Sequence, residues 1–133
     1  MTSPHDPPKP TRAENRIASF RYAFAGWGFV LRNTPNAWIH LSIMLAVIAV
    51  GLWLRLDLLR WALLVLAMAL VWVSELINTA IEAVVDLASP ERHPLAGAAK
   101  DVAAAAVLTA AGFSVIIGLL VLGPPLLARL SLF

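Results

Sequence analysis

The chain has 133 residues, of which 60% are hydrophobic and 14% are charged, and its formal net charge is +2 at pH 7. Soluble globular domains contain roughly 45–50% apolar residues, so this composition indicates a small integral membrane protein. The weak, dispersed positive charge argues against a nucleic-acid partner, and the absence of cysteine excludes disulfides and thiolate metal sites. One domain is expected at this length, and oligomerisation is expected because so short a chain encloses little core.

The N-terminal segment changes character near residue 14. Residues 1–13 contain four prolines and few apolar groups, which predicts a disordered tail and no signal peptide. From Glu14 to Leu31 the apolar residues return at helical spacing with arginines on both sides of the stripe. This pattern is typical of a basic amphipathic helix lying in the membrane interface. Pro35 ends the pattern, because the residue before a proline is disfavoured in the α region.

Three apolar segments follow, each long enough to cross a bilayer. We expect spans at about 38–54, between the interfacial anchors Trp38 and Trp53, at about 61–85, and at about 101–122. A polar connection, 87–97, separates the second span from the third, and the run 123–125 (Gly-Pro-Pro) is expected to end the third. The predicted fold is therefore an all-α integral membrane protein with a single domain, 14–133, made of a surface helix and three transmembrane helices.

The basic residues are unequally divided between the two ends of these spans. One side carries seven, namely Lys9, Arg12, Arg16, Arg21, Arg32, Arg92 and Lys100. The other side carries three, Arg55, Arg60 and Arg129. Because the side richer in Lys and Arg faces the cytoplasm, this bias predicts a cytoplasmic N-terminus in a bacterial inner membrane protein. The end of the second span then faces the compartment that supplies ATP.

That end of the second span carries acids without a helix breaker. At about 100° per residue, Glu75, Asn78, Glu82 and Asp86 lie within about 80° of arc on one helix face, with Thr79 beside them. An ionisable group at membrane depth costs at least ~2.5 kcal/mol and usually carries function. No lysine or arginine occurs between residues 74 and 88, so the carboxylates repel unless a cation or a bound proton intervenes. A divalent metal and a proton-accepting base would both relieve this repulsion.

The acidic stripe also carries a resemblance to a known family. The segment 75–86, Glu-Leu-Ile-Asn-Thr-Ala-Ile-Glu-Ala-Val-Val-Asp, followed by His93 and by Ala-Lys-Asp-Val-Ala-Ala-Ala-Ala-Val over 99–107, resembles the signature of the prokaryotic diacylglycerol kinases. That family includes undecaprenol kinases. The segments Ser19–Gly26 and Asn33–His40 are more similar to the undecaprenol-kinase branch. The resemblance therefore favours undecaprenol as the lipid, with diacylglycerol as the close alternative.

The resemblance implies an ATP-dependent lipid kinase with sites between the protomers of a homotrimer. The γ-phosphoryl group of ATP would pass to a lipid hydroxyl at the cytoplasmic interface, with Mg²⁺ as the cofactor. By motif, Glu75 would be the general base, and Glu82 a metal ligand that also contacts the nucleotide. The other positions matching nucleotide contacts are Tyr22, Gly26, Asn78, Lys100 and Asp101. Phosphoryl transfer requires chiefly a metal clamp, a cation on the phosphates and an oriented nucleophile, and these residue types can supply all three.

Thr34 departs from the family pattern. Most members carry a glutamate just after the surface helix, where this chain has Thr34. Three possibilities follow: Thr34 holds a metal-bound water, Asp86 or another acid substitutes, or catalysis is impaired. Mg²⁺ often uses only one or two carboxylates plus phosphates and water, which favours retained activity. Asn33, Thr34, Thr79 and Asp86 are accordingly expected to support the site from around it.

Each site residue also has a purely structural interpretation. Glu75 could be a carboxylate satisfied by a neighbouring helix, and Glu82 and Asp86 could belong to a solvated helix end. Lys100 and Asp101 could form a charged pair at a helix start, and histidines in such positions, His40 and His93, are more often structural than catalytic. A non-enzymatic three-span protein that moves protons or cations is one alternative, although it gives no reason for Lys100–Asp101 or for the basic surface helix. A lipid phosphatase or lipid-binding partner is another, although the arginine and histidine constellation of lipid phosphatases is represented nearby only by Arg92 and His93.

Overall fold

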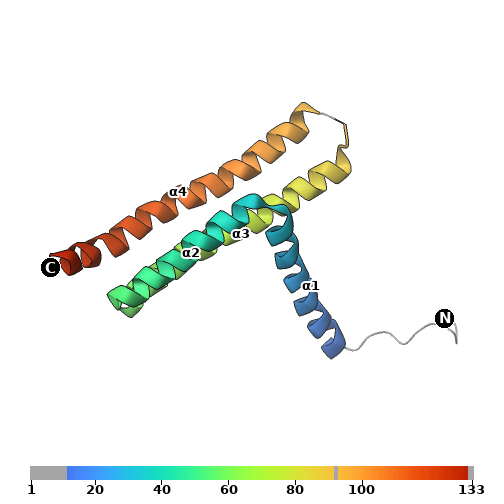
Figure 1. The fold of residues 1–133 in the computed structure, drawn as a ribbon. Coiled ribbons are helices and arrows are strands. Elements are labelled where there is room, and N and C mark those ends of the chain that lie inside the picture. Colours follow the sequence, from blue (N-terminus) through green and yellow to red (C-terminus); the bar gives the residue numbers. More distant parts are fainter. Residues whose placement is uncertain (1–11, 92, 132–133) are drawn as a thin grey trace.

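A computed structural model describes residues 12–91 and 93–131, with side chains from residue 18 onward. All regular secondary structure in this part of the chain is helical. Four helices follow one another: α1 (Arg12–Asn33), α2 (Pro35–Leu54), α3 (Leu58–Ala88) and α4 (Pro94–Leu130) (Figure 1). The last three are long and apolar enough to cross a membrane. The predicted all-α architecture with three spans is confirmed. Most of the predicted disordered tail, 1–11, and Arg92 lie outside the described residues.

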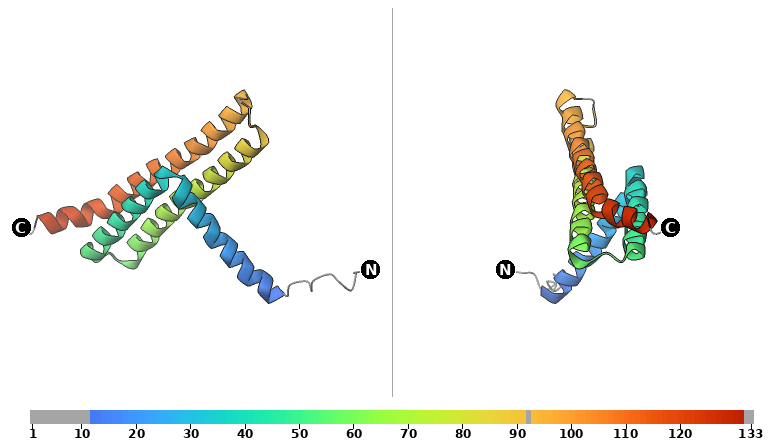
Figure 2. Two further views of the ribbon diagram at one scale, coloured as in Figure 1. Left: turned by 45° about the vertical axis from the view of Figure 1, so that its right-hand side comes forward. Right: turned by 90° about the vertical axis from the view of Figure 1, so that its left-hand side faces the viewer.

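Helix α1 diverges from the other three helices (Figures 1 and 2). Phe20 and Phe24 are exposed along it, as expected for a helix that lies against a lipid surface. Its C-terminal end is anchored, because the ring of Trp27 lies 4.9 Å from that of Trp72 on α3. Thr34 then breaks the helix in an extended conformation, with φ −117° and ψ 103°, and Pro35 opens α2. Proline is favoured at the first helical position, so the chain turns sharply here.

Helices α2 and α3 form an antiparallel pair joined by a tight turn. Arg55 adopts the left-handed conformation, with φ 52°, and Asp57 caps α3 by accepting a hydrogen bond from the backbone N–H of Arg60 at 3.0 Å. Beside the turn, Trp61 packs directly on Gly51. A Cβ atom on Gly51 would lie only 2.9 Å from the Trp61 ring, so glycine is required for this close approach.

Helix α3 packs most extensively against α4, its antiparallel neighbour (Figure 1). Small residues, Ala67 on α3 and Ala103 and Ala110 on α4, are buried in this pair and allow close backbone approach in the membrane. The hydroxyl of Ser114 donates across the interface to the carbonyl of Ala67 at 3.0 Å. At 31 residues, α3 is about 46 Å long and exceeds the ~30 Å hydrocarbon core, so its acidic end reaches the interface.

Helix α4 is longer than expected at its C-terminal end. The prolines at 124 and 125 do not end it, since helix continues through them to Leu130. The last turns, drawn in red, bend away from the axis of the rest of α4 (Figure 2). Proline removes a helical hydrogen bond and clashes with the preceding turn, which bends a helix without necessarily ending it. At the other end α4 begins at Pro94, capped by His93, and Lys100 therefore lies inside the helix.

Candidate active site

Glu75 is the most deeply buried polar residue of the described chain. It lies near the middle of α3 with 1% of its surface exposed. Its Oε2 atom faces Nε2 of His40, on α2, at 3.9 Å, whereas its Oε1 atom has no hydrogen-bond partner. Burying a carboxylate oxygen without a hydrogen-bond partner costs free energy of folding, so such an oxygen is a candidate for binding a further group. The arrangement leaves one oxygen available to accept a proton.

The polar face continues along α3 from Glu75 toward the interface. Thr79 donates its hydroxyl to the Glu75 carbonyl at 2.9 Å, and Asn78 donates its side-chain amide to Oε1 of Glu82 at 3.2 Å. Asn78 and Thr79 are buried, Glu82 is half-buried and Asp86 is exposed. Polarity therefore grades from a closed membrane interior to water along one helix face, in the order expected from the spacing.

Thr34 lies against this face. Its hydroxyl is 3.3 Å from the hydroxyl of Thr79, so the junction of α1 and α2 is held beside α3 between Glu75 and Glu82. The amide of the preceding residue, Asn33, donates to the Phe29 carbonyl at 2.8 Å. At position 34 this chain thus places a neutral hydroxyl that lies against another hydroxyl.

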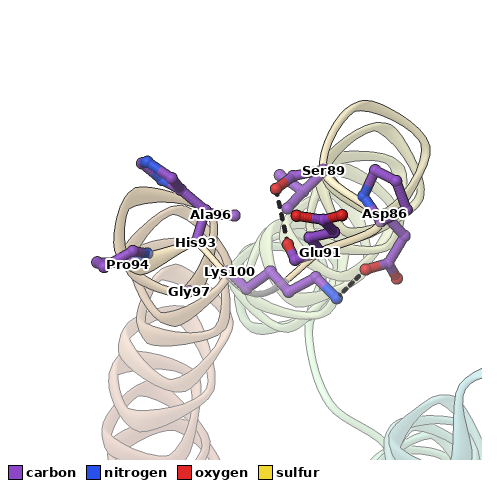
Figure 3. A pocket seen from close by; sticks show the side chains of 10 residues that line it. Asp86, Ser89, Glu91, His93, Pro94, Ala96, Gly97 and Lys100 are labelled. Atoms are coloured by element: carbon purple, nitrogen blue, oxygen red, sulfur yellow. Dashed lines mark hydrogen bonds and ion pairs between the residues drawn. The ribbon is translucent and has the colours of Figure 1, made fainter.

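Lys100 reaches the opposite end of the polar face. Its ammonium forms an ion pair with Asp86, joining α4 to α3 (Figure 3). The cation that the acidic segment of α3 lacks thus comes from the next helix. The pair borders an open pocket of about 490 Å³ lined by Ser89, Glu91 and His93, among others. Asp101, the neighbour of Lys100, is exposed.

Tyr22 and Gly26 lie on α1, upstream of the anchored Trp27. Tyr22 is exposed, with the Arg21 guanidinium 5.5 Å from its ring centre, and a Cβ on Gly26 would meet nothing within 4 Å. Within the described part of the chain, neither residue makes a hydrogen bond or ion pair with the acidic face. One chain therefore brings together Glu75, Asn78, Thr79, Glu82 and Thr34, but not all of the residues predicted to bind nucleotide.

The residues described contain no cluster of three or more His, Cys, Asp or Glu side chains able to hold a metal. Glu82 provides one carboxylate, oriented by the amide of Asn78. Mg²⁺ characteristically keeps several waters and binds through one or two carboxylates plus the phosphates of its substrate. The chain thus fits a magnesium ion that arrives with a nucleotide better than one held permanently by the protein.

Sequence reasoning missed the position of His40. Its imidazole is held edge-on to Trp72, with ring centres 6.5 Å apart, and faces the Glu75 carboxylate. The available signal was an ionisable residue inside an otherwise apolar span, which is a candidate functional residue by default. The pairing of Asp86 with Lys100 was also missed, because it depends on how α3 and α4 pack.

His40 also borders an apolar groove of about 310 Å³ between α2, α3 and α4. The lining includes Met44 and Val47 from α2, Met68 from α3 and Val115 from α4. The groove therefore joins a hydrocarbon-compatible surface to the polar face at the histidine next to Glu75.

Comparison with known proteins gives a consistent result. Residues 21–122 match the family model of the prokaryotic diacylglycerol kinases. The chain is 45% identical over 117 residues to a diacylglycerol kinase of Synechocystis, covering 87% of this chain and 67% of that one. It is 41% identical over 108 residues to the undecaprenol kinase of Bacillus subtilis, covering 81% and 88%. It is 36% identical over 104 residues to the diacylglycerol kinase of Escherichia coli K12, covering 72% and 84%.

The match spans α2, α3 and most of α1 and α4, and it includes Glu75, Glu82 and Lys100. It favours an enzyme over the non-enzymatic alternative. Because the family model covers most of the chain and the relatives share more than a third of their aligned residues, the family is shown. The chain belongs to the prokaryotic diacylglycerol kinase family and is a lipid kinase, a phosphotransferase with an alcohol acceptor.

Proposed function

We propose that the protein transfers the γ-phosphoryl group of ATP to the hydroxyl of a membrane lipid at the cytoplasmic interface, with undecaprenol preferred over diacylglycerol. The observation that carries this proposal is the Glu75 carboxylate, which is 1% exposed on a membrane helix and has an unpartnered Oε1. A lipid hydroxyl enters such a site from the membrane side, whereas nucleotide enters from water. The charge bias of the sequence supports a cytoplasmic N-terminus, and with that orientation the end of α3 would lie beside cellular ATP.

In the proposed reaction, the lipid hydroxyl oxygen attacks the γ-phosphorus while its proton passes to Oε1 of Glu75. The bond between the γ-phosphorus and the bridging oxygen breaks, and its electron pair leaves on ADP. Glu75 later returns the proton to water. Glu82, oriented by Asn78, would hold Mg²⁺, which neutralises phosphate charge when bound. Lys100 supplies a cation for the phosphates once the incoming nucleotide competes with Asp86.

The apolar groove supports a lipid as the acceptor. A hydrocarbon chain lying along it would bring its polar end to His40 and Glu75. Val115→Trp fills the groove from α4, and we expect it to raise the KM for lipid about tenfold while the KM for ATP stays unchanged. Leu108→Trp, on an exposed position of α4 outside the groove, is the matched control. An unchanged lipid KM in Val115→Trp would remove the groove from the lipid path.

We further propose that the working enzyme is a homotrimer with sites shared between protomers. Asp86, which holds Lys100 in this chain, lies eleven residues beyond Glu75, or about 16 Å along α3. This separation is too long for one transferred phosphoryl group to touch both, so a neighbouring protomer is the natural source of the cation. Mixing Glu75→Gln chains with Lys100→Met chains would then rebuild intact sites. Recovery of activity on mixing is expected, and no recovery despite mixed trimers would overturn shared sites.

The experiment that tests the function follows labelled γ-phosphate from ATP into extracted lipid. Purified protein is given undecaprenol and diacylglycerol in parallel, at equal mole fraction in the same detergent micelles. Label in both lipids with a higher kcat/KM for undecaprenol is the expected result. A higher kcat/KM for diacylglycerol would reverse the preferred substrate, and label in neither lipid would refute the proposal.

A further inference from the structure

Among the described residues, one basic side chain faces the Glu75 carboxylate, and it comes from another helix. In the described chain, His40 is the only basic side chain within ion-pair distance of Glu75, with Nε2 at 3.9 Å from Oε2. The same carboxylate has 1% of its side chain exposed, and the imidazole 16%. The separation is longer than a hydrogen bond, so the contact is electrostatic, and its loss would leave the charge of the buried carboxylate less well compensated.

The imidazole is held by aromatic packing. Trp72 is 7% exposed and meets the His40 ring edge-on, with ring centres 6.5 Å apart and planes inclined by 68°. Trp72 in turn packs against Trp27 of α1, with ring centres 4.9 Å apart. Aromatic side chains of α1 and α3 therefore hold the imidazole of α2 in place, and hence determine which carboxylate oxygen it faces.

The two oxygens of Glu75 are unequal as a result. Oε2 faces the histidine, whereas Oε1 has no partner. We propose that His40 is a positioning residue for phosphoryl transfer: its Nε2–H directs Oε2 and thereby presents Oε1 to the lipid hydroxyl. This inference rests on the proposed function. In the transfer step the hydroxyl proton goes to Oε1 of Glu75, and His40 neither gains nor loses a proton.

The proposal depends on the N–H group of His40 and its position, not on the volume of the side chain. Three variants separate these properties. His40→Gln keeps an N–H donor near the place of Nε2, His40→Asn keeps a donor that is too short to reach, and His40→Met keeps the volume without a donor. The assay measures kcat, and KM for ATP and for lipid, on the full-length purified protein. Thermal unfolding is measured for each variant in the same micelles.

We expect His40→Met and His40→Asn to lower kcat about tenfold or more, with the KM for ATP changed less than about twofold, because misorientation of a reacting group acts on the chemical step. His40→Gln should remain within about threefold of the wild-type kcat. Wild-type kcat in His40→Met or His40→Asn would overturn the proposal, as would an equal loss in His40→Gln. If neither Met nor Asn variant folds while His40→Gln does, the histidine stabilises the fold and the positioning role is overturned.

The wild-type protein separates this proposal from the function on which it rests. If the wild type transfers phosphate and His40→Met transfers it equally well, only the proposed role of His40 is overturned. No transfer by the wild type to either lipid overturns both.

Discussion

Replacing Thr34 by glutamate tests whether the proposed metal site is limited by the lack of a second carboxylate. The Thr34 hydroxyl lies 3.3 Å from that of Thr79, and Thr79 is three residues before Glu82 on α3. Side chains three apart on a helix are neighbours, about 5–6 Å between Cβ atoms. A glutamate at position 34 would therefore bring a second carboxylate within reach of the metal ion that Glu82 is proposed to hold.

Two costs destabilise the metal-free variant, and bound Mg²⁺ opposes the second. Losing the contact between the two hydroxyls costs about 0.5–1.5 kcal/mol. Two carboxylates about 6 Å apart repel by roughly 3 kcal/mol at an effective dielectric constant of 20, and a bound Mg²⁺ converts this repulsion into attraction. The metal-free variant should therefore unfold at a lower temperature than wild type, and Mg²⁺ should stabilise the variant more than it stabilises wild type.

The assay is kcat/KM against free Mg²⁺ at fixed ATP. We expect Thr34→Glu to lower the Mg²⁺ concentration for half-maximal activity by about tenfold, which corresponds to ~1.4 kcal/mol of added metal binding. Thr34→Gln is the matched control, since it has the same length and no charge. An unchanged Mg²⁺ dependence, or an equal shift in Thr34→Gln, would refute the idea that a second carboxylate is what the site lacks.

Two further predictions concern the turn between α2 and α3. Gly51→Ala should destabilise the protein by about 1–3 kcal/mol, because its Cβ would meet the Trp61 ring at 2.9 Å. Gly112→Ala is the control and should leave stability unchanged, since its Cβ would meet nothing within 4 Å. Equal unfolding temperatures for the two variants would show that the Trp61 ring moves freely. The pKa of Asp57 is lowered from its ordinary 3.8, chiefly by the hydrogen bond from the backbone N–H of Arg60. The ionised Asp57 therefore contributes stability above about pH 4, and this contribution is lost as the pH falls through the lowered pKa. Asp57→Asn should lack this part of the acid destabilisation. Identical curves of stability against pH for the variant and the wild type would contradict the role of Asp57 as a cap.

The fold was largely readable from the sequence because the membrane imposes simple requirements. Long apolar runs bounded by charged or aromatic residues predict spanning helices whatever their partners. The exact ends were harder to place. The sequence predicted that the third span begins next to Lys100, yet α4 begins at Pro94. The two prolines after Gly123 were expected to end the helix, but they only bend it.

The candidate site was readable only in part, for a physical reason. Glu75, Asn78 and Glu82 share one helix, so their common face follows from helical geometry alone. The neighbours of Glu75 and Asp86 on other helices, His40 and Lys100, depend on how the helices pack. Packing between helices of similar apolar composition leaves little trace in the pattern of a single sequence, because many small contacts determine it.

The role of Glu75 as the base is tested most directly by transfer of labelled γ-phosphate to undecaprenol by wild type and by Glu75→Gln. The glutamine keeps the shape of the side chain but cannot accept the proton, so we expect transfer to fall by about 10²–10⁴-fold while ATP binding persists. Asp57→Asn, which changes the acid that caps the N-terminus of α3, is the matched control and should transfer at the wild-type rate. Wild-type turnover in Glu75→Gln would contradict the account.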